Sequence, residues 1–311
     1  MNKNNFFSKP INVFIFALIC TALWGSAYPC IKKGYEIFNL VREDIPGKLL
    51  FAGIRFSAAG IITLIIYRLM GNKLIIPGKR VSLGILYVGL IQTFIQYIFF
   101  YIGLANTTGV KSSILNSSVS FFSIILAHFF VKSDRINFRK SLGCVVGFLG
   151  IIVINIRGVN SGDLSFTLLG DGSVLLAALA FSVGALIAKI YSKDISPVLI
   201  TGYQLTLGGI ILMTTGLVSG GHLTFNTAAG ILLLTYMACL SAVAFTLWTI
   251  LNKYNDMSKV AIYNFLTPVF GTVFSAIFLH ENLFELQNLL ALILVCGGIM
   301  IVNLSRSPIS D

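Results

Sequence analysis

The chain has 311 residues, of which 56% are hydrophobic and 11% are charged, and its formal net charge is +11. A soluble domain carries about 25% charged residues, so this composition excludes a protein whose whole surface faces water. The apolar residues come in blocks of about 20, the length that crosses a ~30 Å hydrocarbon core as an α-helix. The connections are short and leave no room for a separate soluble domain. The sequence therefore predicts an all-α integral membrane protein.

Ten apolar blocks follow one another, and we expect each to be one transmembrane helix. They cover about 12–34, 47–70, 81–104, 109–131, 139–157, 171–190, 196–218, 227–250, 258–279 and 285–304. The first block follows Lys3 and Lys9, as in a signal peptide. It is longer than the apolar region of a typical signal peptide and has no clear cleavage site, so we expect it to be an uncleaved span.

The basic residues predict the orientation. With the N-terminus inside, fifteen of the 22 Lys and Arg residues fall on the cytoplasmic side, six fall outside, and Arg55 lies within a span. The positive-inside rule then places both termini in the cytoplasm, which agrees with an even number of spans. In a soluble protein this charge would suggest nucleic acid, but here it reports topology. We expect a multi-pass protein of the cell (cytoplasmic) membrane with no nucleic-acid partner.

Motifs for catalysis or cofactor binding are not found in the sequence. The five cysteines lie inside or at the ends of apolar blocks, without CxxC or His-paired spacing, so neither a metal site nor a disulfide framework is expected. There is no P-loop, no HExxH, and no pair of histidines or carboxylates. The sequence therefore predicts no enzyme, no catalytic residue, no metal and no cofactor.

The second half of the chain repeats the first. Residues 111–155 align without a gap on residues 259–303, 148 positions further on. The matched residues include Asn116 with Asn264, Gly150 with Gly298 and, at an offset of 149, Arg55 with Gln204 and Tyr87 with Tyr236. Coincident Asn, Gly and Tyr are harder to obtain by chance than coincident Leu and Ile. We predict two five-helix repeats, 1–157 and 158–311.

An odd number of spans in each repeat makes the repeats antiparallel in the membrane. Inverted repeats recur in transporters, because two equivalent halves can open a central site to either side. An inverted two-fold axis would place Asn116 and Asn264 on either side of the midplane, facing one cavity. Pro268 should bend its span and free a carbonyl, which is tolerated where water or other helices satisfy it. A purely structural role of Pro268 in the bundle is an equal alternative.

Three segments carry a resemblance to a known family: "LWGSAYPCIKKG" at 23–34, "GIRFSAAGIITLIIY" at 53–67, and "NFLTPVFGTVFSAIFLHENLFELQNLLALILVCGGIMIVN" at 264–303. They resemble the EamA-like branch of the drug/metabolite transporter superfamily, over essentially the whole chain. The resemblance implies a carrier that moves small metabolites or drugs, most often outward, by alternating access. Spans three, four, eight and nine would form its path. Two departures are Ser120, where the repeat predicts a proline, and an acidic residue displaced to Asp134.

Arg55 is the clear charge within a span, and burying a charge in a membrane costs several kcal/mol unless it is paired. No carboxylate lies at a span centre, although Asp171 and Glu281 near the outer face are within reach. A structural anchor and an anion-binding residue are equal alternatives. Facing a cavity, Arg55 would favour a carboxylate through bidentate contact.

Other polar and aromatic side chains in the spans are candidates for a pathway. Gln92 and Gln96 are four residues apart and share a helix face, and so do Asn116 and Ser120. Interhelical hydrogen bonds of ~0.6 kcal/mol are the alternative role. The predicted substrate-binding or pathway residues are Trp24, Tyr28, Arg55, Gln92, Gln96, Tyr97, Asn116, Ser120, Gln204, Tyr236, Thr246, Tyr263 and Asn264, and the predicted hinges are Gly25, Pro29 and Pro268.

The sequence thus predicts a secondary transporter that exports a small metabolite, such as an amino acid or a related compound. Its partners are this small-molecule substrate and the lipid bilayer. An importer with the same fold is an alternative, because inverted halves are neutral with respect to direction. A membrane enzyme or a scaffold acting on lipid-linked substrates is an alternative from another class. Substrate, coupling ion and the choice between monomer and homodimer stay open.

Overall fold

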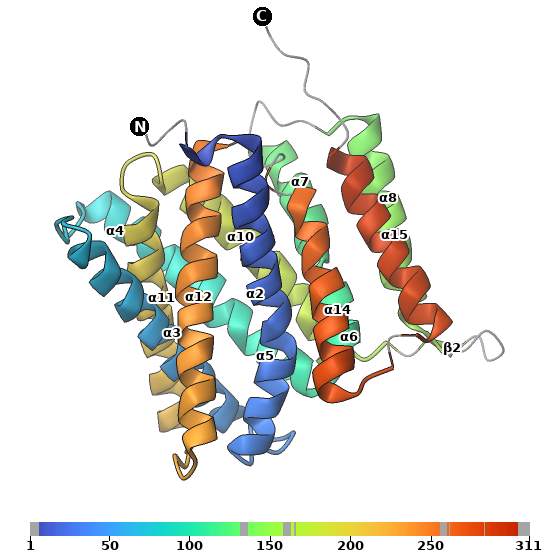
Figure 1. Cartoon of the computed structure of the whole chain (residues 1–311), viewed down its shortest axis with the longest axis horizontal. Coiled ribbons are helices and arrows are strands. Elements are labelled where there is room, and N and C mark those ends of the chain that lie inside the picture. The colour runs from blue at the N-terminus through green and yellow to red at the C-terminus, as the bar shows by residue number, and fades with distance from the viewer. Residues whose placement is uncertain are drawn as a thin grey trace, which may run out of the picture.

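The computed structural model describes residues 6–130, 136–157, 163–164, 166–255, 260, 262–282 and 284–303. Its helices stand side by side in one bundle (Figure 1). Each of the ten apolar blocks predicted from the sequence overlaps a helical segment of the structure. The all-helical class is therefore as predicted.

The first half of the chain forms α2 (Pro10–Ile37), α3 (Ile45–Leu69), α4 (Lys79–Val88), the π-helical segment η1 (Gly89–Ile95), α5 (Gln96–Ala105), α6 (Gly109–Asn116), α7 (Ser118–Phe130) and α8 (Phe138–Val153). Two-residue strands β1 (Ile156–Arg157) and β2 (Asp163–Leu164) pair antiparallel in the connection between the halves. The second half forms η2 (Leu168–Gly172), α10 (Ser173–Tyr191), α11 (Pro197–Val218), α12 (Ala228–Tyr254), the 3-10 segment η3 (Ile262–Phe265), α14 (Leu266–Leu279) and α15 (Leu286–Asn303). The Pro10 end of α2 and the Asn303 end of α15 lie on the same side of the bundle (Figure 1).

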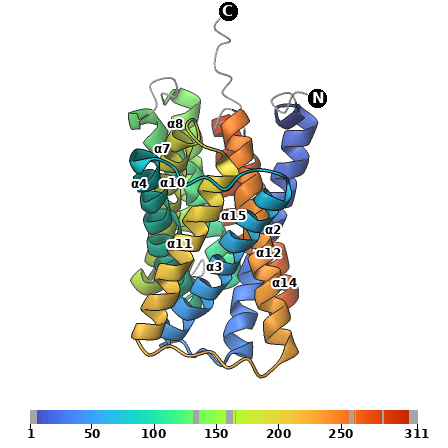
Figure 2. The same ribbon diagram turned by 90° about the vertical axis from the view of Figure 1, so that its left-hand side faces the viewer.

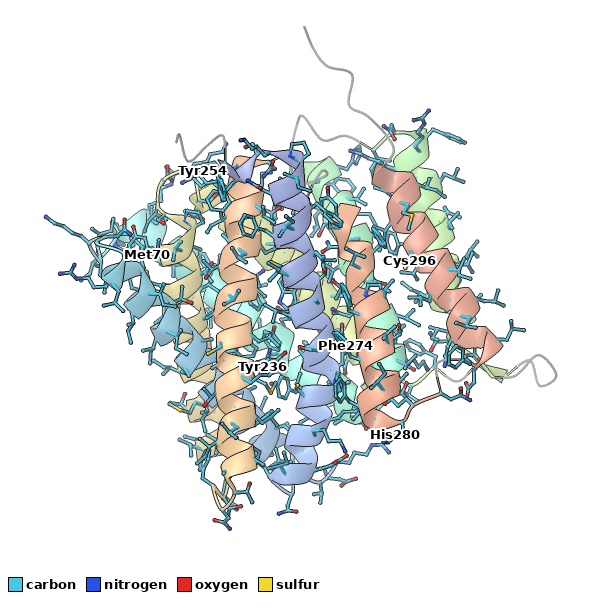
Figure 3. The ribbon with its side chains drawn as sticks, in the orientation of Figure 1. Met70, Tyr236, Tyr254, Phe274, His280 and Cys296 are labelled. Atoms are coloured by element: carbon cyan, nitrogen blue, oxygen red, sulfur yellow. The ribbon has the colours of Figure 1, made fainter. Side chains whose placement is uncertain are left out.

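Among the described residues, seven helical segments are long and apolar enough to cross a membrane. Two more apolar helices, Tyr263–Leu279 and Leu286–Val302, are shorter. Large apolar side chains are exposed on the outside of the bundle, such as Ile65 at 52% and Phe278 at 57%, and Figure 3 shows such side chains standing out around it. Lipid rather than water suits such a surface. The chain is a multi-pass membrane protein.

Polar side chains define where several helices begin. The side chains of Asp44, Thr108, Asn137 and Thr227 each accept a hydrogen bond from a backbone N–H three residues later, at the first turn of α3, α6, α8 and α12. Such caps satisfy N–H groups that have no partner within the helix. They set the helix starts next to the short connections.

Two predicted helices are interrupted in the middle. The third predicted span contains η1, a π-type stretch around Gln92, and π-type stretches often occur at functional sites. The fourth breaks at Ser117, whose hydroxyl donates to the Ile114 carbonyl oxygen, while the Ser120 N–H bonds the Ser117 oxygen at 3.0 Å. A serine hydroxyl competes with the helical ladder in this way. Both interruptions lie beside the cavity described below.

Helices α3 and α11 lie side by side (Figure 2) and approach so closely that only glycine fits between their backbones. A Cβ atom at Gly60 would overlap Thr206, and one at Gly209 would overlap Ser57. At the repeat offset of 149, Gly60 aligns with Gly209 and Ser57 aligns with Thr206. The Gly60–Thr206 contact and the Gly209–Ser57 contact are therefore equivalent in the two repeats.

Helices α8 and α15 pack in the same manner. A Cβ atom at Gly150 would lie 2.9 Å from the Ala291 carbonyl oxygen, and one at Gly298 would lie 2.6 Å from that of Gly143. At the repeat offset of 148, Gly150 aligns with Gly298 and Gly143 aligns with Ala291, so these two contacts are equivalent as well. Residues that the alignment pairs therefore make matching contacts from opposite helices. Small residues at such interfaces let backbones approach, which favours helix association in lipid.

Candidate functional site

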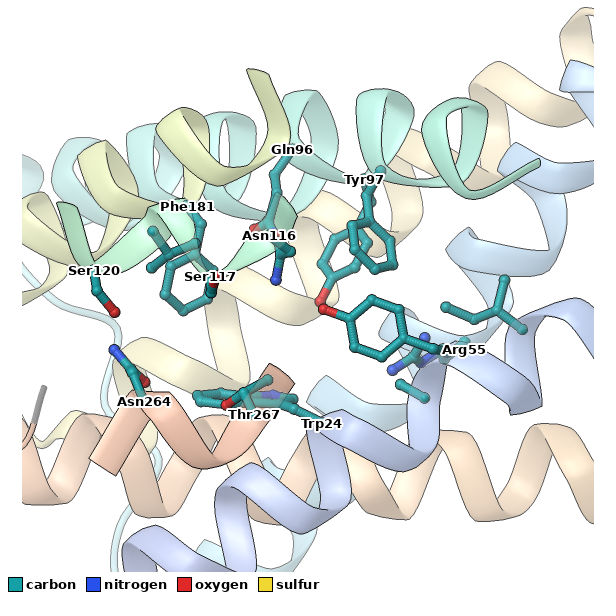
Figure 4. A pocket seen from close by; sticks show the side chains of 15 residues that line it. Trp24, Arg55, Gln96, Tyr97, Asn116, Ser117, Ser120, Phe181, Asn264 and Thr267 are labelled. Atoms are coloured by element: carbon teal, nitrogen blue, oxygen red, sulfur yellow. The ribbon is translucent and has the colours of Figure 1, made fainter. Parts of the chain in front are cut away.

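A central cavity with about 640 Å³ of empty volume lies between α2, α3, α5, α7, α10 and the start of α14 (Figure 4). We call it the central cavity. Its lining residues are Trp24, Ala27, Tyr28, Ile31, Arg55, Gln96, Tyr97, Phe100, Asn116, Ser117, Val119, Ser120, Phe181, Asn264 and Thr267.

The structure brings eight of the predicted pathway residues together around this cavity. They are Trp24, Tyr28, Arg55, Gln96, Tyr97, Asn116, Ser120 and Asn264. They come from both halves of the chain, and Figure 4 shows Ser120 and Asn264 facing each other. The two asparagines that the repeat aligns, Asn116 and Asn264, line one cavity.

The other five predicted pathway residues lie away from the central cavity. Gln204 accepts a hydrogen bond from the Thr93 hydroxyl at 2.5 Å, and Tyr236 is 43% exposed and shares a 2.7 Å hydrogen bond with Ser26. Gln92 lines a second cavity, and Tyr263 packs on Phe14 with ring centres 5.8 Å apart. Thr246 is part-buried in α12. The contacts of Gln204 with Thr93 and of Tyr236 with Ser26 link neighbouring helices.

Several lining residues fall outside the predicted pathway set. Phe181 of α10 and Thr267 of α14 are among them, and Ala27, Ile31, Phe100 and Val119 are apolar. Helical spacing is the signal that finds most of them, because Ile31 follows Ala27 by four, Phe100 follows Gln96 by four and Thr267 follows Asn264 by three.

Arg55 is 2% exposed and holds its guanidinium at the cavity wall. Its Nε donates to the Ser241 hydroxyl at 3.0 Å, and Nη1 donates to the Tyr101 hydroxyl at 3.2 Å. Its Cζ lies 4.6 Å from the centre of the Phe56 ring. A guanidinium has five N–H donors, so these two hydrogen bonds leave donors for a ligand in the cavity.

The expectation that Asp171 or Glu281 reaches Arg55 is wrong. Asp171 accepts a 2.9 Å bond from Lys111 Nζ in the first turn of α6. Glu281 accepts bonds from the backbone N–H groups of Gly109 and Val110 at 2.8 and 2.7 Å, where α6 begins. Helix N-termini attract carboxylates in this way. Within the described residues, no carboxylate pairs with Arg55.

The central cavity also contains buried hydrogen-bond acceptors, in addition to the guanidinium of Arg55. Gln96 Oε1, Asn116 Oδ1 and Ser120 Oγ are buried without a hydrogen-bond partner among the described residues. A buried acceptor without a partner loses about 1–3 kcal/mol of solvation, so a donor group in the cavity would be stabilised there. The cavity thus offers donors at Arg55 and acceptors on α5, α6 and α7.

Aromatic rings separate the central cavity from a second one. Trp24 contacts Phe181, Phe245 and Trp248 with ring centres 6.0, 5.8 and 5.0 Å apart. We call these four residues the aromatic partition. The second cavity, of about 370 Å³, lies behind it towards the Tyr254 end of α12 and includes Gln92, Lys189 and Asn252 in its lining. Phe181 lines both cavities.

Tight contacts between helices lie at the opposite end of the central cavity. A Cβ atom at Gly109 would lie 2.5 Å from Ser275 Oγ, so α6 and α14 touch there. The Tyr35 hydroxyl donates to the Tyr101 carbonyl oxygen at 3.0 Å, which ties α2 to α5. Lys32 lies 3.8 Å from Glu281. We call the α6–α14 contact with Glu281 and Lys32 the outer clamp, because the sequence predicts that this end faces the outside.

The predicted hinges sit inside this packing. Pro268 is the third residue of α14, directly after the 3-10 segment η3, where a backbone N–H has no helical partner to lose. Pro29 is buried within the continuous helix α2. Gly25 packs against α14, since a Cβ there would lie 2.9 Å from the Gly271 nitrogen. Their hinge role stays a prediction.

The part of the chain that the structure describes contains no group of three or more His, Cys, Asp or Glu side chains placed to hold a metal ion. The polar groups of the central cavity are amides, hydroxyls and one guanidinium. This set can bind an organic solute through hydrogen bonds and charge.

The model of the EamA-like transporter family matches the chain twice, over residues 12–156 and 168–304. The protein therefore belongs to the EamA-like transporter family. This places it among transporters of the drug/metabolite superfamily, as the resemblance implies.

Curated relatives are distant but span most of this chain. The WAT1-related protein At3g02690, chloroplastic, of Arabidopsis thaliana is 24% identical, over 85% of this chain and 63% of that protein, so the chain spans less than two thirds of that relative. The uncharacterized transporter YoaV of Bacillus subtilis is 23% identical, over 93% of this chain and 96% of YoaV. The uncharacterized inner membrane transporter YedA of Escherichia coli K12 is 24% identical, over 96% and 92%.

A crystal structure of another protein superimposes on the chain with a TM-score of 0.69, covering 95% of this chain and 98% of the other. The two sequences are 15% identical. The likeness shows that the fold is shared.

Proposed function

We propose that the protein is a secondary transporter of the cytoplasmic membrane that exports a small zwitterionic metabolite, such as an amino acid with an apolar side chain. The observation that carries the proposal is the central cavity, which joins a guanidinium without a carboxylate partner, buried acceptors without donors, and aromatic walls. Each of these features fits one part of such a solute.

A carboxylate fits Arg55. Guanidinium and carboxylate form paired, parallel hydrogen bonds, and such charge-assisted bonds are stronger than neutral ones. Arg55 is already oriented by Ser241 and Tyr101, so little side-chain freedom is lost on binding. An amino group fits the acceptors Gln96 Oε1 and Asn116 Oδ1, and the apolar remainder fits against the rings of Tyr28 and Phe100, which pack on each other with centres 5.7 Å apart.

Alternating access between two inverted five-helix repeats, 1–157 and 158–311, is the proposed mechanism, with ten spans and both termini in the cytoplasm. Two matches to one family model support the repeats, and so do the contacts of α3 with α11 and of α8 with α15 that exchange at the repeat offset. The name of YedA as an inner membrane transporter supports the membrane assigned here. The outer clamp and the aromatic partition then lie on opposite sides of the substrate.

Counterflow in proteoliposomes tests the proposed substrate and site. Proteoliposomes that contain the purified protein are loaded with unlabelled amino acid. Uptake of each labelled L-amino acid is then measured for the wild type, Arg55→Gln and Gln96→Leu. We expect counterflow of some amino acids by the wild type and a loss of at least tenfold in both variants. Gln287→Leu is the matched control, because Gln287 bonds the Ile154 oxygen just after α8 at 2.7 Å and lies outside the cavity.

Counterflow that both cavity variants retain would contradict the proposed site. No counterflow of any amino acid by folded wild-type protein would contradict the proposed substrate class. Release of preloaded amino acid from cells that express the protein, compared with uptake by the same cells, decides between export and import.

A further inference from the structure

The inference starts from the charge balance of the central cavity. Arg55 is 2% exposed, and both groups that bond it, the hydroxyls of Ser241 and Tyr101, are neutral. The ion pairs of the described chain lie elsewhere, at Lys32–Glu281, Lys33–Glu36 and Lys111–Asp171. The cavity therefore contains a fixed positive charge that described residues do not neutralise.

The guanidinium is held at this depth by three different helices. Arg55 belongs to α3, Tyr101 to α5 and Ser241 to α12, and Ser241 also donates to the Met237 oxygen at 2.9 Å. A long basic side chain often reaches out to water along its flexible stem. These bonds oppose such an escape, because Nε and Nη1 would both lose their partners. In this structure the charge is therefore held at the cavity wall.

Alternating access requires a stage in which both ends of the cavity are closed. In this structure the outer clamp packs at one end of the cavity and the aromatic partition lies at the other. At this stage Arg55 is removed from water without a counter-charge, and an unpaired charge within a membrane protein is strongly disfavoured. A substrate carboxylate on the guanidinium removes this penalty, whereas closing over an unliganded site keeps it.

We propose that the protein is an exchanger, in which an anionic or zwitterionic solute must occupy Arg55 for the cavity to pass from one side of the membrane to the other. The proposal rests on the proposed function and specifies how transport proceeds. The unliganded carrier returns slowly, so outward movement of one solute is coupled to inward movement of another. A ligand shifts a conformational equilibrium only by its different affinity for the two states, and here the carboxylate supplies that difference. Solutes without a carboxylate should not speed up the return.

A cysteine reporter tests the step without any substrate. Ser275 is fully buried in the outer clamp against Gly109, so a cysteine there can react only when the outer end opens. With the five native cysteines replaced, Ser275→Cys is introduced beside Arg55, Arg55→Gln or Arg55→Lys, and reaction with a charged maleimide is followed in nanodiscs without amino acids. We expect slow labelling with Arg55 and Arg55→Lys and labelling at least tenfold faster with Arg55→Gln.

Controls and added solutes complete this test. Lys33→Gln removes a positive charge from an exposed site on α2, where Lys33 bonds Glu36, and should leave labelling slow. A pool of the twenty common L-amino acids should speed the labelling of the Arg55 protein, and a pool of amino-acid amides, which lack the carboxylate, should not. Equal labelling of the Arg55 and Arg55→Gln proteins without solute would overturn the proposal.

Transport measurements separate this proposal from the proposed function. Proteoliposomes loaded with labelled amino acids release them into buffer with or without unlabelled amino acids. We expect external unlabelled amino acids to speed release by at least tenfold for the wild type. For Arg55→Gln we expect them to leave the rate of release unchanged. Equal release under both conditions for the wild type would overturn exchange but leave the transporter standing. A third outcome is that no amino acid is released under either condition while Arg55→Gln still speeds the maleimide labelling of Ser275→Cys. This outcome would overturn the amino-acid substrate but support the role of Arg55.

Discussion

At the scale of single residues, Arg55 is placed by groups that touch it rather than by an ion pair. Ser241 accepts from Nε at 3.0 Å and Tyr101 accepts from Nη1 at 3.2 Å. The Phe56 ring lies under the guanidinium carbon at 4.6 Å. These neutral neighbours orient the guanidinium and leave its charge for a substrate.

Ser241→Ala should weaken substrate binding without removing the charge. A hydrogen bond to a charged group contributes about 1.5–3 kcal/mol, so we expect the half-saturating substrate concentration to rise by roughly tenfold or more. Counterflow at varied substrate concentration measures it. Thr214→Ala is the control, because Thr214 bonds only the Ile210 and Ile211 oxygens of its own helix. An unchanged half-saturating concentration in Ser241→Ala would show that Ser241 does not position Arg55.

At the scale of helices, neighbouring glycines have opposite surroundings in α15. A Cβ atom at Gly298 would lie 2.6 Å from the Gly143 oxygen and 2.6 Å from the Gly147 nitrogen of α8, whereas a Cβ atom at Gly297 would meet no atom within 4 Å. Backbone atoms cannot move aside as a flexible side chain can. The contact between α8 and α15 therefore depends on Gly298.

Gly298→Ala and Gly297→Ala form a matched pair of variants. We expect Gly298→Ala to lower the stability by about 1–3 kcal/mol, as overpacking does, and Gly297→Ala to keep or raise it, because alanine favours a helix by about 1 kcal/mol over glycine. The measurement is the midpoint of thermal unfolding in detergent, read by size-exclusion chromatography. Equal midpoints for the two variants would contradict the close packing of α8 on α15.

At the scale of the whole molecule, the outer clamp joins parts of the chain that are far apart in sequence. Glu281 follows α14, yet its carboxylate binds the backbone at the start of α6 and lies 3.8 Å from Lys32 of α2. In the proposed mechanism, opening the cavity outward separates these elements. A covalent link across the clamp should therefore stop transport.

Gly109→Cys with Ser275→Cys places two cysteines across this contact. A Cβ atom at Gly109 would lie 3.1 Å from the Ser275 Cβ, slightly closer than the 3.5–4.5 Å typical of a disulfide, so a small adjustment permits the bond. In the cysteine-free background, oxidation should reduce counterflow by at least tenfold, and a reductant should restore it. Each single-cysteine variant should be insensitive to oxidation. Full activity of the oxidised, cross-linked protein would show that the clamp does not open during transport.

The sequence by itself determined much of the architecture. Long apolar blocks can satisfy their backbone groups in lipid only as helices, so their positions followed from composition. The family followed from motifs such as those around Trp24 and Asn264, which agree with the family match. Arg55, Gln96, Asn116 and Asn264 were found because polar groups in a membrane are disfavoured unless they have a partner or line a cavity.

Only the tertiary structure decided which polar residues share a cavity. Gln204 aligns with Arg55 in the repeat, yet it bonds Thr93 while Arg55 lines the cavity. Both lie on helices that are apolar all round, so periodicity does not reveal which face meets which neighbour. The partners of Asp171 and Glu281, the break at Ser117 and the contacts of Tyr236 likewise depend on which segments meet across the bundle. Helix formation is local and can be predicted from the chain, whereas side-chain surroundings arise from packing between distant segments.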